Sequence, residues 1–525
     1  MKTRKLDRRK ALFAAVSGIL VTAAFPNISF SWLVWVSLVP LLIALRDLSV
    51  KDSFRIGLLG GFVHFLGLVY WVAFTMRTYG HLPLYLSLLI LGLMAAYLAL
   101  YWALFTAALA WLRPKPHSLV ILAPLLWVVC EYLRSHLFTG FPWGLLGHTQ
   151  YKALHLIQIC DITGVYGLSF LIVLSNTALY MVLLHLAAKP WYGRPVGKWL
   201  APSALLALGV LLSAVWLHGA WRIKNVDQQI SQAPQSPVAV IQGNIDQSIK
   251  WDPAYQIITT NTYRKLSLST KAEKPALVVW PETATPFYYL TNTRLTKLVQ
   301  ESIIDTGTYF LIGSPFFMRT AGRAAYYNSA YLIEPDGKVS GRYDKVHLVP
   351  YGEYIPLKRW LPFLGKIVAE VGDFSAGNKG NTLTWDQNRL GVLICYEAIF
   401  PGLARALVRN QADLLVNITN DAWFGRTSAA QQHFSMAVFR AVENRRALVR
   451  AANTGISGYI DPVGRILQTS PSFERRVMNR PVALMRLTTL YTRGGDIFAL
   501  VCLIGALALG LRRLIAGRIK PAAKQ

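Results

Sequence analysis

The chain has 525 residues, of which 54% are hydrophobic and only 15% are charged. Soluble domains carry about 25% charged residues, so this composition excludes a wholly soluble protein and indicates that much of the chain lies in lipid. The formal net charge of +28 would suggest nucleic-acid binding in a soluble protein. Here the basic residues cluster at the ends of apolar segments, which is typical of membrane topology, and we expect no nucleic-acid partner.

Several apolar segments precede a long, more polar middle region, and one more follows it. The basic start of the chain resembles a signal peptide, but no clear cleavage site follows, which favours an uncleaved first helix. The apolar segments lie near residues 11–25, 29–45, 56–76, 82–112, 118–138, 163–188, 199–220 and 495–516. Most are near or above the roughly 20 residues that cross a bilayer, although the first two are short. We therefore predict a polytopic α-helical membrane domain of about eight spans.

Basic residues recur in alternate loops between these segments. They occur at Arg46, Lys51, Arg55, Arg113, Lys115, Lys189, Arg194 and Lys198, and both ends of the chain are basic as well. The positive-inside rule then places both termini in the cytoplasm and the middle region on the opposite side. We expect an N-terminal transmembrane domain over residues 1–220, an extracytoplasmic domain over 221–493, and a C-terminal transmembrane helix with its tail over 494–525.

The middle region has the pattern of an α/β domain. Short apolar runs typical of buried strands lie at residues 238–241, 276–280, 309–312, 390–394 and 414–416. The clearest amphipathic helix is predicted over residues 429–450, and Ser428 with Gln431 has the spacing of a capping box at its start. The segment 228–237 is polar and contains two prolines, which is typical of a domain entry.

Cys395 is the one cysteine of this middle region. The other three, Cys130, Cys160 and Cys502, lie in strongly apolar stretches, so the middle region has no internal disulfide. Cys395 directly follows the apolar run 390–394 and precedes two polar residues. A free cysteine is most often a small buried hydrophobic residue, but at a strand end it is a candidate nucleophile if a base and an oxyanion stabiliser lie nearby.

Two other segments carry side chains that suit such a nucleophile. Glu282 follows the apolar run 276–280, at the carboxyl end of a predicted strand where ligands gather in α/β sheets. Lys345 lies among valine, leucine and aromatic residues. A glutamate in an apolar pocket gains basicity and can accept the thiol proton, and an ammonium with a backbone N–H can stabilise an oxyanion. Considered separately, Glu282 also fits a solvated loop carboxylate and Lys345 a surface residue of a hairpin.

Together these segments resemble the Glu–Lys–Cys signatures of the nitrilase superfamily. The resemblance rests on Trp-Pro-Glu-Thr (280–283), Asp-Lys-Val-His-Leu-Val-Pro-Tyr-Gly-Glu (344–353), Ile-Cys-Tyr-Glu (394–397) and a downstream run from Asn420 to Gly455. With apolar spans on both sides, the chain is similar to the membrane-embedded branch of that superfamily, the apolipoprotein N-acyltransferases. The resemblance implies a nitrilase-like αββα sandwich in the middle domain and a bacterial inner (cytoplasmic) membrane protein with this domain in the periplasm.

The resemblance also implies roles for individual residues. Glu282 would be the general base, Lys345 the oxyanion stabiliser and Cys395 the nucleophile. The supporting residues would be Glu353, Tyr396, Glu397 and Trp251. The implied reaction moves an acyl chain from a phospholipid, typically phosphatidylethanolamine, through a thioester on Cys395 to the N-terminal diacylglyceryl-cysteine of an apolipoprotein. We expect the enzyme to act as a monomer.

Two alternatives stay open at this point. A membrane-tethered nitrilase-type amidase, which hydrolyses a C–N bond, would use the same three residues. A transporter with an inactive domain is disfavoured because the apolar segments contain few acidic residues, Glu131 being an exception. The sequence contains no metal-ligand spacing, P-loop or dinucleotide fingerprint, so we expect no metal and no cofactor. The unusually apolar segment 359–368, which includes Trp360 and Lys366, suggests either a lid that dips into the membrane interface or a buried loop.

Overall fold

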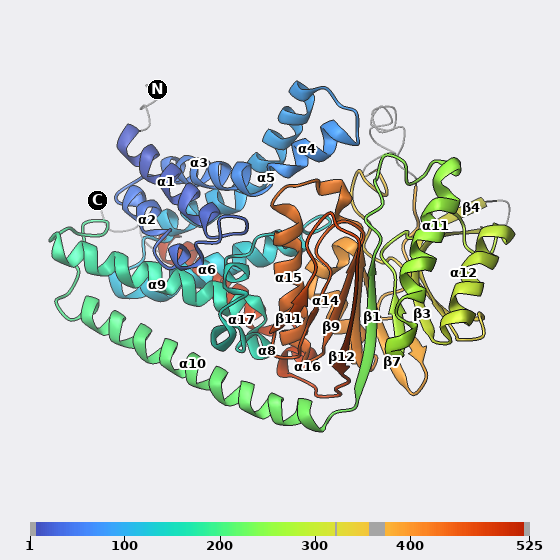
Figure 1. Cartoon of the computed structure of the whole chain (residues 1–525). Coiled ribbons are helices and arrows are strands. Elements are labelled where there is room, and N and C mark those ends of the chain that lie inside the picture. Colours follow the sequence, from blue (N-terminus) through green and yellow to red (C-terminus); the bar gives the residue numbers. More distant parts are fainter. Residues whose placement is uncertain (1–6, 321–322, 356–372, 519–525) are drawn as a thin grey trace. The chain divides into compact units, whose positions relative to one another are not determined.

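The computed structural model describes residues 7–320, 323–355 and 373–518. The predicted lid over residues 359–368 lies outside these described residues. The chain divides into two compact units: one contains residues 1–77, 82–221 and 494–525, and the other contains residues 78–81 and 222–493. Figure 1 shows the first unit as helical and the second as a combination of strands and helices.

The first unit consists of apolar helices. Their bounds are α1 (Arg8–Ala23), α2 (Val39–Leu45), α3 (Val50–Leu68), α4 (Trp71–Thr78), α5 (Leu84–Leu112), α6 (Pro116–His136), α7 (Leu154–Ile157), α8 (Cys160–Thr163), α9 (Val165–Leu186), α10 (Leu200–Gln232) and α17 (Ile497–Arg518). Among the described residues, α5, α6, α9, α10 and α17 are long and apolar enough to cross a membrane. The pair α3 and α4 passes the same test together but is bent by 51°.

The first two predicted spans are short in the structure. Helix α1 has 16 residues, and the apolar segment Ser31–Leu45 consists of a 3-10 helix followed by the seven-residue α2. At 1.5 Å per residue, 16 residues extend about 24 Å, less than the hydrocarbon thickness of a typical bilayer. By length and composition the described residues contain five spans, or six if the bent pair counts as one.

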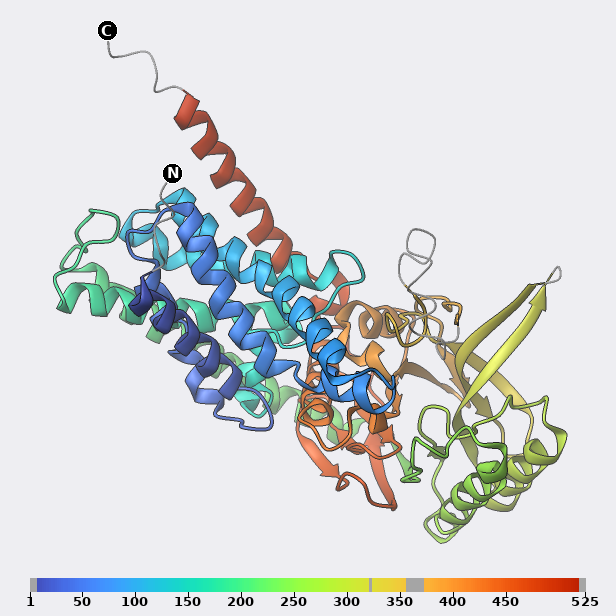
Figure 2. The ribbon, with the colours of Figure 1, turned by 90° about the horizontal axis from the view of Figure 1, so that it is seen from above.

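The second unit contains two six-stranded sheets. The first has the order β12-β1-β2-β3-β4-β5, with β1 (Gln235–Gln242), β2 (Leu277–Val279), β3 (Tyr309–Thr320), β4 (Arg323–Ile333), β5 (Val339–Asp344) and β12 (Arg476–Ala483). The second has the order β11-β10-β9-β8-β7-β6, with β6 (Leu383–Trp385), β7 (Asn388–Ile394), β8 (Leu414–Thr419), β9 (Leu448–Ala452), β10 (Gly458–Ile460) and β11 (Ile466–Thr469). Figure 2 shows the hairpin of β3 and β4, in yellow, extending beyond the neighbouring strands.

The two sheets face each other, and each has helices on its outer face. The Tyr459 hydroxyl, on β10 of the second sheet, donates to the carbonyls of Val238 and Met478 on the first. Helices α11 (Pro253–Leu268) and α12 (Thr293–Thr306) pack on the first sheet through residues such as Val299. Helices α14 (Pro401–Arg409) and α15 (Ala429–Asn444) cover the second sheet, and a side chain at Gly391 would collide with Leu407 of α14. The unit is therefore an αββα sandwich.

The five strands predicted in the middle region are confirmed as β1, β2, β3, β7 and β8. The predicted helix over 429–450 is wrong at its end, because α15 stops at Asn444 and residues 448–452 form β9. Arg445 follows α15 with φ of 51°, a left-handed conformation that ends a helix. The predicted capping box is also absent, since the Ser428 side chain makes no cap hydrogen bond to the backbone of α15.

Candidate active site

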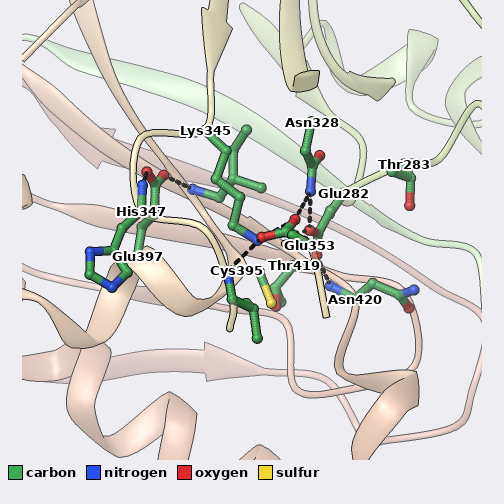
Figure 3. A network of polar contacts seen from close by, with 12 residues as sticks. Glu282, Thr283, Asn328, Lys345, His347, Glu353, Cys395, Glu397, Thr419 and Asn420 are labelled. Carbon is green, nitrogen blue, oxygen red and sulfur yellow. Dashed lines mark hydrogen bonds and ion pairs between the residues drawn. The ribbon is translucent and has the colours of Figure 1, made fainter. Parts of the chain in front are cut away.

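Cys395 lies where β7 ends and the short 3-10 helix η4 (Cys395–Ile399) begins. Its φ is 52°, in the left-handed region that is unfavourable for most side chains. Its carbonyl accepts hydrogen bonds from His433 Nε2 (3.0 Å) and Asn417 Nδ2 (3.4 Å). Such a backbone conformation persists where its surroundings hold it in place. In Figure 3 the Cys395 sulfur lies beside the charged groups of Lys345, Glu282 and Glu353.

Glu282 follows β2 in a tight turn that approaches the neighbouring strand closely. A side chain at Gly313 of β3 would lie 2.4 Å from the Pro281 carbonyl oxygen, so only glycine fits there. The Glu282 carboxylate accepts from Asn328 Nδ2 (2.7 Å) at Oε1 and from the backbone N–H of Asn420 (2.8 Å) at Oε2. These donors come from both sheets, and they hold the carboxylate in one orientation between the strand ends.

Lys345 directly follows β5 and is buried between two carboxylates. Its Nζ lies 2.9 Å from Glu353 Oε1 and 3.5 Å from Glu282 Oε1. Asn328 Nδ2 also donates to Glu353 Oε1 (2.8 Å), and the backbone N–H of Val349 donates to Glu353 Oε2 (2.9 Å). One amide and one ammonium therefore bind both glutamates (Figure 3).

The charges of the cluster determine the protonation state of the thiol. Burial, and next the Glu282 carboxylate, raise the pKa of Cys395 to about 12, although Lys345 opposes this shift. Burial acts to lower the pKa of Lys345, but Glu353 and Glu282 outweigh it and hold that pKa above its usual range. At neutral pH the site therefore holds a protonated thiol beside an ammonium, so a nucleophilic thiolate requires a base within reach.

Glu397 connects the turn at Cys395 to the loop after Lys345. Its carboxylate accepts from the backbone N–H groups of Val346 (2.7 Å), His347 (3.1 Å) and Ile394 (2.7 Å), and from the Tyr343 hydroxyl (3.1 Å). Burial raises the pKa of Glu397 to about 7, and the backbone donors oppose this shift. Glu397 thus fixes the distance between the two loops that carry Lys345 and Cys395.

The other two predicted residues lie around this cluster. The Tyr396 ring packs against His347 and Phe400, with ring centroids 5.8 and 5.0 Å away. Trp251 lies in the turn before α11 with 48% of its surface exposed, and none of its described contacts joins it to the charged cluster. The structure therefore brings Glu282, Lys345, Glu353 and Cys395 together, places Tyr396 and Glu397 next to them, and leaves Trp251 at the surface.

Two contributors were missed from the sequence as site residues. Asn328 lies within the apolar strand β4, where no motif marks it. Lys250 adjoins Trp251, and its buried Nζ donates to the Glu282 carbonyl (3.2 Å) and the Thr283 hydroxyl (2.6 Å). Burial lowers the pKa of Lys250 to about 8. Its position beside Trp251, which the family resemblance implied as a supporting residue, was the one available signal.

A buried network behind Cys395 was also missed. The Asp421 carboxylate accepts from Arg450 Nη2 (2.7 Å) and lies 3.1 Å from His433 Nδ1. Arg450 Nη1 also donates to Asn417. Since a carbonyl only accepts, the His433 nitrogen that contacts the Cys395 carbonyl carries a hydrogen. Burial lowers the pKa of His433, which favours the neutral ring. The run from Asn420 supported the family resemblance, but its spacing did not reveal this contact.

Comparisons with known proteins identify the family of each part of the chain. Residues 237–490 match the family described as carbon-nitrogen hydrolase, and residues 17–178 match the apolipoprotein N-acyltransferase N-terminal domain. The second unit is therefore a carbon-nitrogen hydrolase domain, the α/β class of the nitrilase superfamily. An amidase of that superfamily from Nesterenkonia AN1 is 18% identical with a TM-score of 0.35, covering 49% of this chain and 93% of its own.

Full-length relatives identify the family within this class. An apolipoprotein N-acyltransferase from Geobacter metallireducens is 45% identical over 512 residues, covering 97% of this chain and 96% of the relative. One from Pseudomonas syringae is 34% identical over 503 residues, covering 94% and 95%. The chain belongs to the apolipoprotein N-acyltransferase family and is an enzyme of the acyltransferase class.

Proposed function

We propose that the chain transfers an acyl chain from a membrane phospholipid to the α-amine of the N-terminal S-diacylglyceryl-cysteine of an apolipoprotein, through a thioester on Cys395. The observation that supports this most directly is the set of contacts that holds Glu282 and Lys345 beside the Cys395 thiol. The relatives' names supply the substrate class. Phosphatidylethanolamine, through its sn-1 chain, is the proposed donor.

In the first half-reaction, Glu282 accepts the Cys395 proton as the sulfur attacks the ester carbonyl. A base is needed because the pKa of the thiol is about 12. The ammonium of Lys345 and the backbone N–H of Tyr396 stabilise the tetrahedral oxyanion. The C–O bond then breaks, the leaving alkoxide takes the proton from Glu282, and a lysophospholipid departs.

In the second half-reaction, the α-amine of the apolipoprotein attacks the thioester. Glu282 accepts a proton from the attacking nitrogen, and the same donors stabilise the second oxyanion. The C–S bond breaks, the Cys395 sulfur takes back the proton, and the amide product leaves. Glu353 and Asn328 keep Lys345 and Glu282 in place through both halves, while Glu397 maintains the spacing of their loops. Trp251 is a proposed substrate contact.

The membrane arrangement belongs to the same proposal. We place residues 1–220 and 494–525 in the bacterial inner membrane as about eight spans, counting the short helix α1, the short segment Ser31–Leu45 and the bent pair of α3 and α4 as one span each besides the five long helices. The domain 221–493 then lies in the periplasm, both termini lie in the cytoplasm, and a monomer is the active form. Both lipid substrates then meet the site from one leaflet. A Ser269→Cys variant tests the orientation, because position 269 is exposed. A membrane-impermeant maleimide should label it in spheroplasts, whereas labelling only after lysis would reverse the orientation.

The proposed base is tested by Glu282→Gln, which keeps the shape of the side chain but removes its basicity. We expect kcat/KM with phospholipid and a lipopeptide to fall about 100- to 10,000-fold, the range of general-base catalysis. Glu273→Gln, at an exposed carboxylate of the same unit, is the matched control and should leave the rate unchanged. A loss of less than about tenfold in Glu282→Gln would assign the proton transfer to another group.

A further inference from the structure

A cavity of about 610 Å³ opens on the second unit, away from the cluster around Cys395. Its lining is rich in guanidinium groups and contains one carboxylate. The charged lining residues are Arg389, Arg409, Arg446, Arg486, Arg493 and Asp413. We refer to it as the arginine pocket.

The positive charge of the arginine pocket is not balanced within the protein. Asp413 is already engaged, accepting from Arg486 Nε (2.7 Å) and from the backbone N–H of Arg389 (2.9 Å). The side chains of Arg389, Arg409 and Arg493 are exposed, and the described residues offer their guanidinium groups no acceptor. An anion that enters the pocket therefore meets three exposed guanidinium groups, and the one carboxylate of the lining, Asp413, is already hydrogen-bonded to Arg486 and Arg389.

Arg446 adds a buried positive charge beneath these exposed side chains. Its guanidinium donates to the carbonyls of Ala412 (2.6 Å) and Leu487 (2.6 Å), which leaves its charge without a hydrogen-bonded carboxylate. Burial, opposed by Asp413 and assisted by Arg486, lowers the pKa of Arg446 to about 10. A buried guanidinium on carbonyl partners is stabilised further when an anion lies above it.

The arginine pocket and Cys395 lie at opposite ends of strand β7 in the second sheet. Strand β7 begins at Asn388, beside the pocket residue Arg389, and ends at Ile394, next to Cys395. At about 3.3 Å per residue, the strand separates the two sites by roughly 20 Å. A group bound in the pocket therefore does not reach the thiol, and the pocket is not where the transferred ester reacts.

The chain connects the arginine pocket directly to an apolar helix. Arg493 lies in α16 (Leu490–Gly494), and α17 begins at Ile497 with exposed apolar side chains such as Leu500 and Val501. Arg405 donates to the carbonyls of Thr492 (3.0 Å) and Arg493 (2.8 Å), which fixes this connection to α14. Leu490, which lies in sequence between the pocket residues Thr488 and Thr492, is 62% exposed. Only three residues separate Arg493 from the start of α17, so a membrane span at α17 would keep this part of the pocket within a short chain length of the lipid headgroups.

We propose that the arginine pocket binds the phosphate of an anionic phospholipid headgroup and anchors the catalytic unit to the membrane surface. Guanidinium groups bind phosphate oxygens in pairs and are weakly hydrated, so they suit this ligand better than ammonium groups would. This anchoring role goes beyond the proposed acyl transfer. It rests on the proposed function in one respect only, which is that α17 spans the membrane. A peptide carboxylate offers fewer oxygens and no acyl chains to lie beside Leu490.

The test measures lipid retention by the full-length protein in detergent micelles titrated with phosphatidylglycerol, using native mass spectrometry. Arg389→Ala/Arg409→Ala/Arg493→Ala should weaken phosphatidylglycerol binding at least about tenfold, since each basic residue near a membrane surface contributes to anionic-lipid affinity. The matched control, Arg294→Ala/Arg475→Ala/Arg476→Ala, removes three exposed arginines elsewhere on the same unit and should bind as the wild type does. If the triple variant fails to fold, Arg409→Glu at the exposed rim provides the same test.

Each outcome decides the proposal. Equal phosphatidylglycerol binding by the two triple variants would overturn it. Binding of inorganic phosphate that the pocket variant loses, with lipid retention unchanged, would make this a site for a soluble anion instead. Retention of an acidic peptide in place of the lipid would make it a protein-binding site. Cys395→Ala should retain phosphatidylglycerol normally, so a failure of the anchor and a failure of the proposed chemistry are distinguishable.

Discussion

Charged side chains are paired differently at the two ends of the parallel strands β7, β8 and β9 in the second unit. Around Cys395, at the carboxyl end of β7, the charges are buried and paired, as in Arg450 with Asp421 and in Lys345, which follows β5 of the first sheet, with Glu353. At the amino ends, the exposed side chains of Arg389, Arg409 and Arg493 in the arginine pocket have no carboxylate partner among the described residues. Paired burial fixes geometry before a substrate arrives, which is what oxyanion stabilisation needs. Unpaired charge leaves binding capacity for a ligand. The role of a charged side chain in this domain therefore depends on whether a partner of opposite charge is hydrogen-bonded to it.

The largest effect should come from removing the buried positive charge of Lys345. Lys345→Met leaves the buried carboxylates of Glu282 and Glu353 without their cation. Removing one partner of a buried ion pair typically costs about 3–5 kcal/mol, so the thermal unfolding midpoint should fall and acyl transfer should be lost. Both are measurable on protein purified in detergent.

Lys338→Met is the control for that change, because Lys338 forms an ion pair with Asp336 (2.6 Å) at an exposed turn. Its unfolding midpoint and rate should match the wild type. Lys345→Met combined with Glu353→Gln should recover part of the lost stability but not the activity. An active and equally stable Lys345→Met protein would show that the ion pairs of Lys345 with Glu282 and Glu353 contribute neither to stability nor to acyl transfer.

A smaller effect is expected from the support behind the nucleophile. His433→Ala removes the 3.0 Å hydrogen bond from His433 Nε2 to the Cys395 carbonyl, while the longer one from Asn417 Nδ2 (3.4 Å) persists. We expect kcat to fall about 10- to 100-fold with little change in KM, because small misplacements of a reacting group are costly. His433→Gln, which can still donate, should recover part of the rate, and His185→Ala is the exposed control. A change in KM alone would refute the positioning role.

The pH dependence offers a finer test at Lys250. With a pKa of about 8, its ammonium stabilises the anionic forms of Glu282 and Cys395 below pH 8 and loses its charge above it. Wild-type kcat/KM should therefore decline by roughly threefold to tenfold as the pH rises through 8, and Lys250→Met should lack this decline. Between about pH 8 and 10.5 the unfolded chain binds this proton and the folded chain does not, so the cost of burying Lys250 falls as pH rises. An identical decline in Lys250→Met would assign it elsewhere.

The smallest effect on acyl transfer is expected from substitutions in the arginine pocket. The triple variant Arg389→Ala/Arg409→Ala/Arg493→Ala should change acyl transfer less than about twofold in micelles without anionic lipid, since the arginine pocket lies roughly 20 Å from Cys395. The assay uses a short-chain phospholipid donor and a lipopeptide. A large loss of transfer under these conditions would mean that the arginine pocket and the cluster around Cys395 are functionally coupled.

Residues of the candidate site could be predicted where a local sequence pattern marked them. Glu282 and Cys395 each follow an apolar strand-like run, and Lys345 lies in a distinctive motif, so sequence order was enough to propose them. Asn328, Lys250 and His433 act through contacts between strands and loops far apart in sequence. Asn328 reaches Glu282 because β2, β3 and β4 lie side by side, and no property of the β4 sequence reveals that its Nδ2 would contact two glutamates.

The helix and span boundaries show a different limit. Apolar spacing continues past Asn444, but the left-handed Arg445 ends α15 and the same apolar residues become the buried strand β9. Hydropathy likewise counts apolar residues, not the length of a continuous helix. The segment Ser31–Leu45 is apolar enough for a span but is divided between two short helices.

The central claim is that Cys395 carries the acyl chain, and mass spectrometry of the purified protein after exposure to phospholipid tests it most directly. With no acceptor present, the wild type should gain the mass of one donor acyl group, in a bond cleaved by hydroxylamine, and peptide mapping should place it on Cys395. Cys395→Ala should gain none, whereas Cys130→Ala should behave as the wild type. Steady turnover without an acyl adduct, or an adduct that persists in Cys395→Ala, would contradict the account.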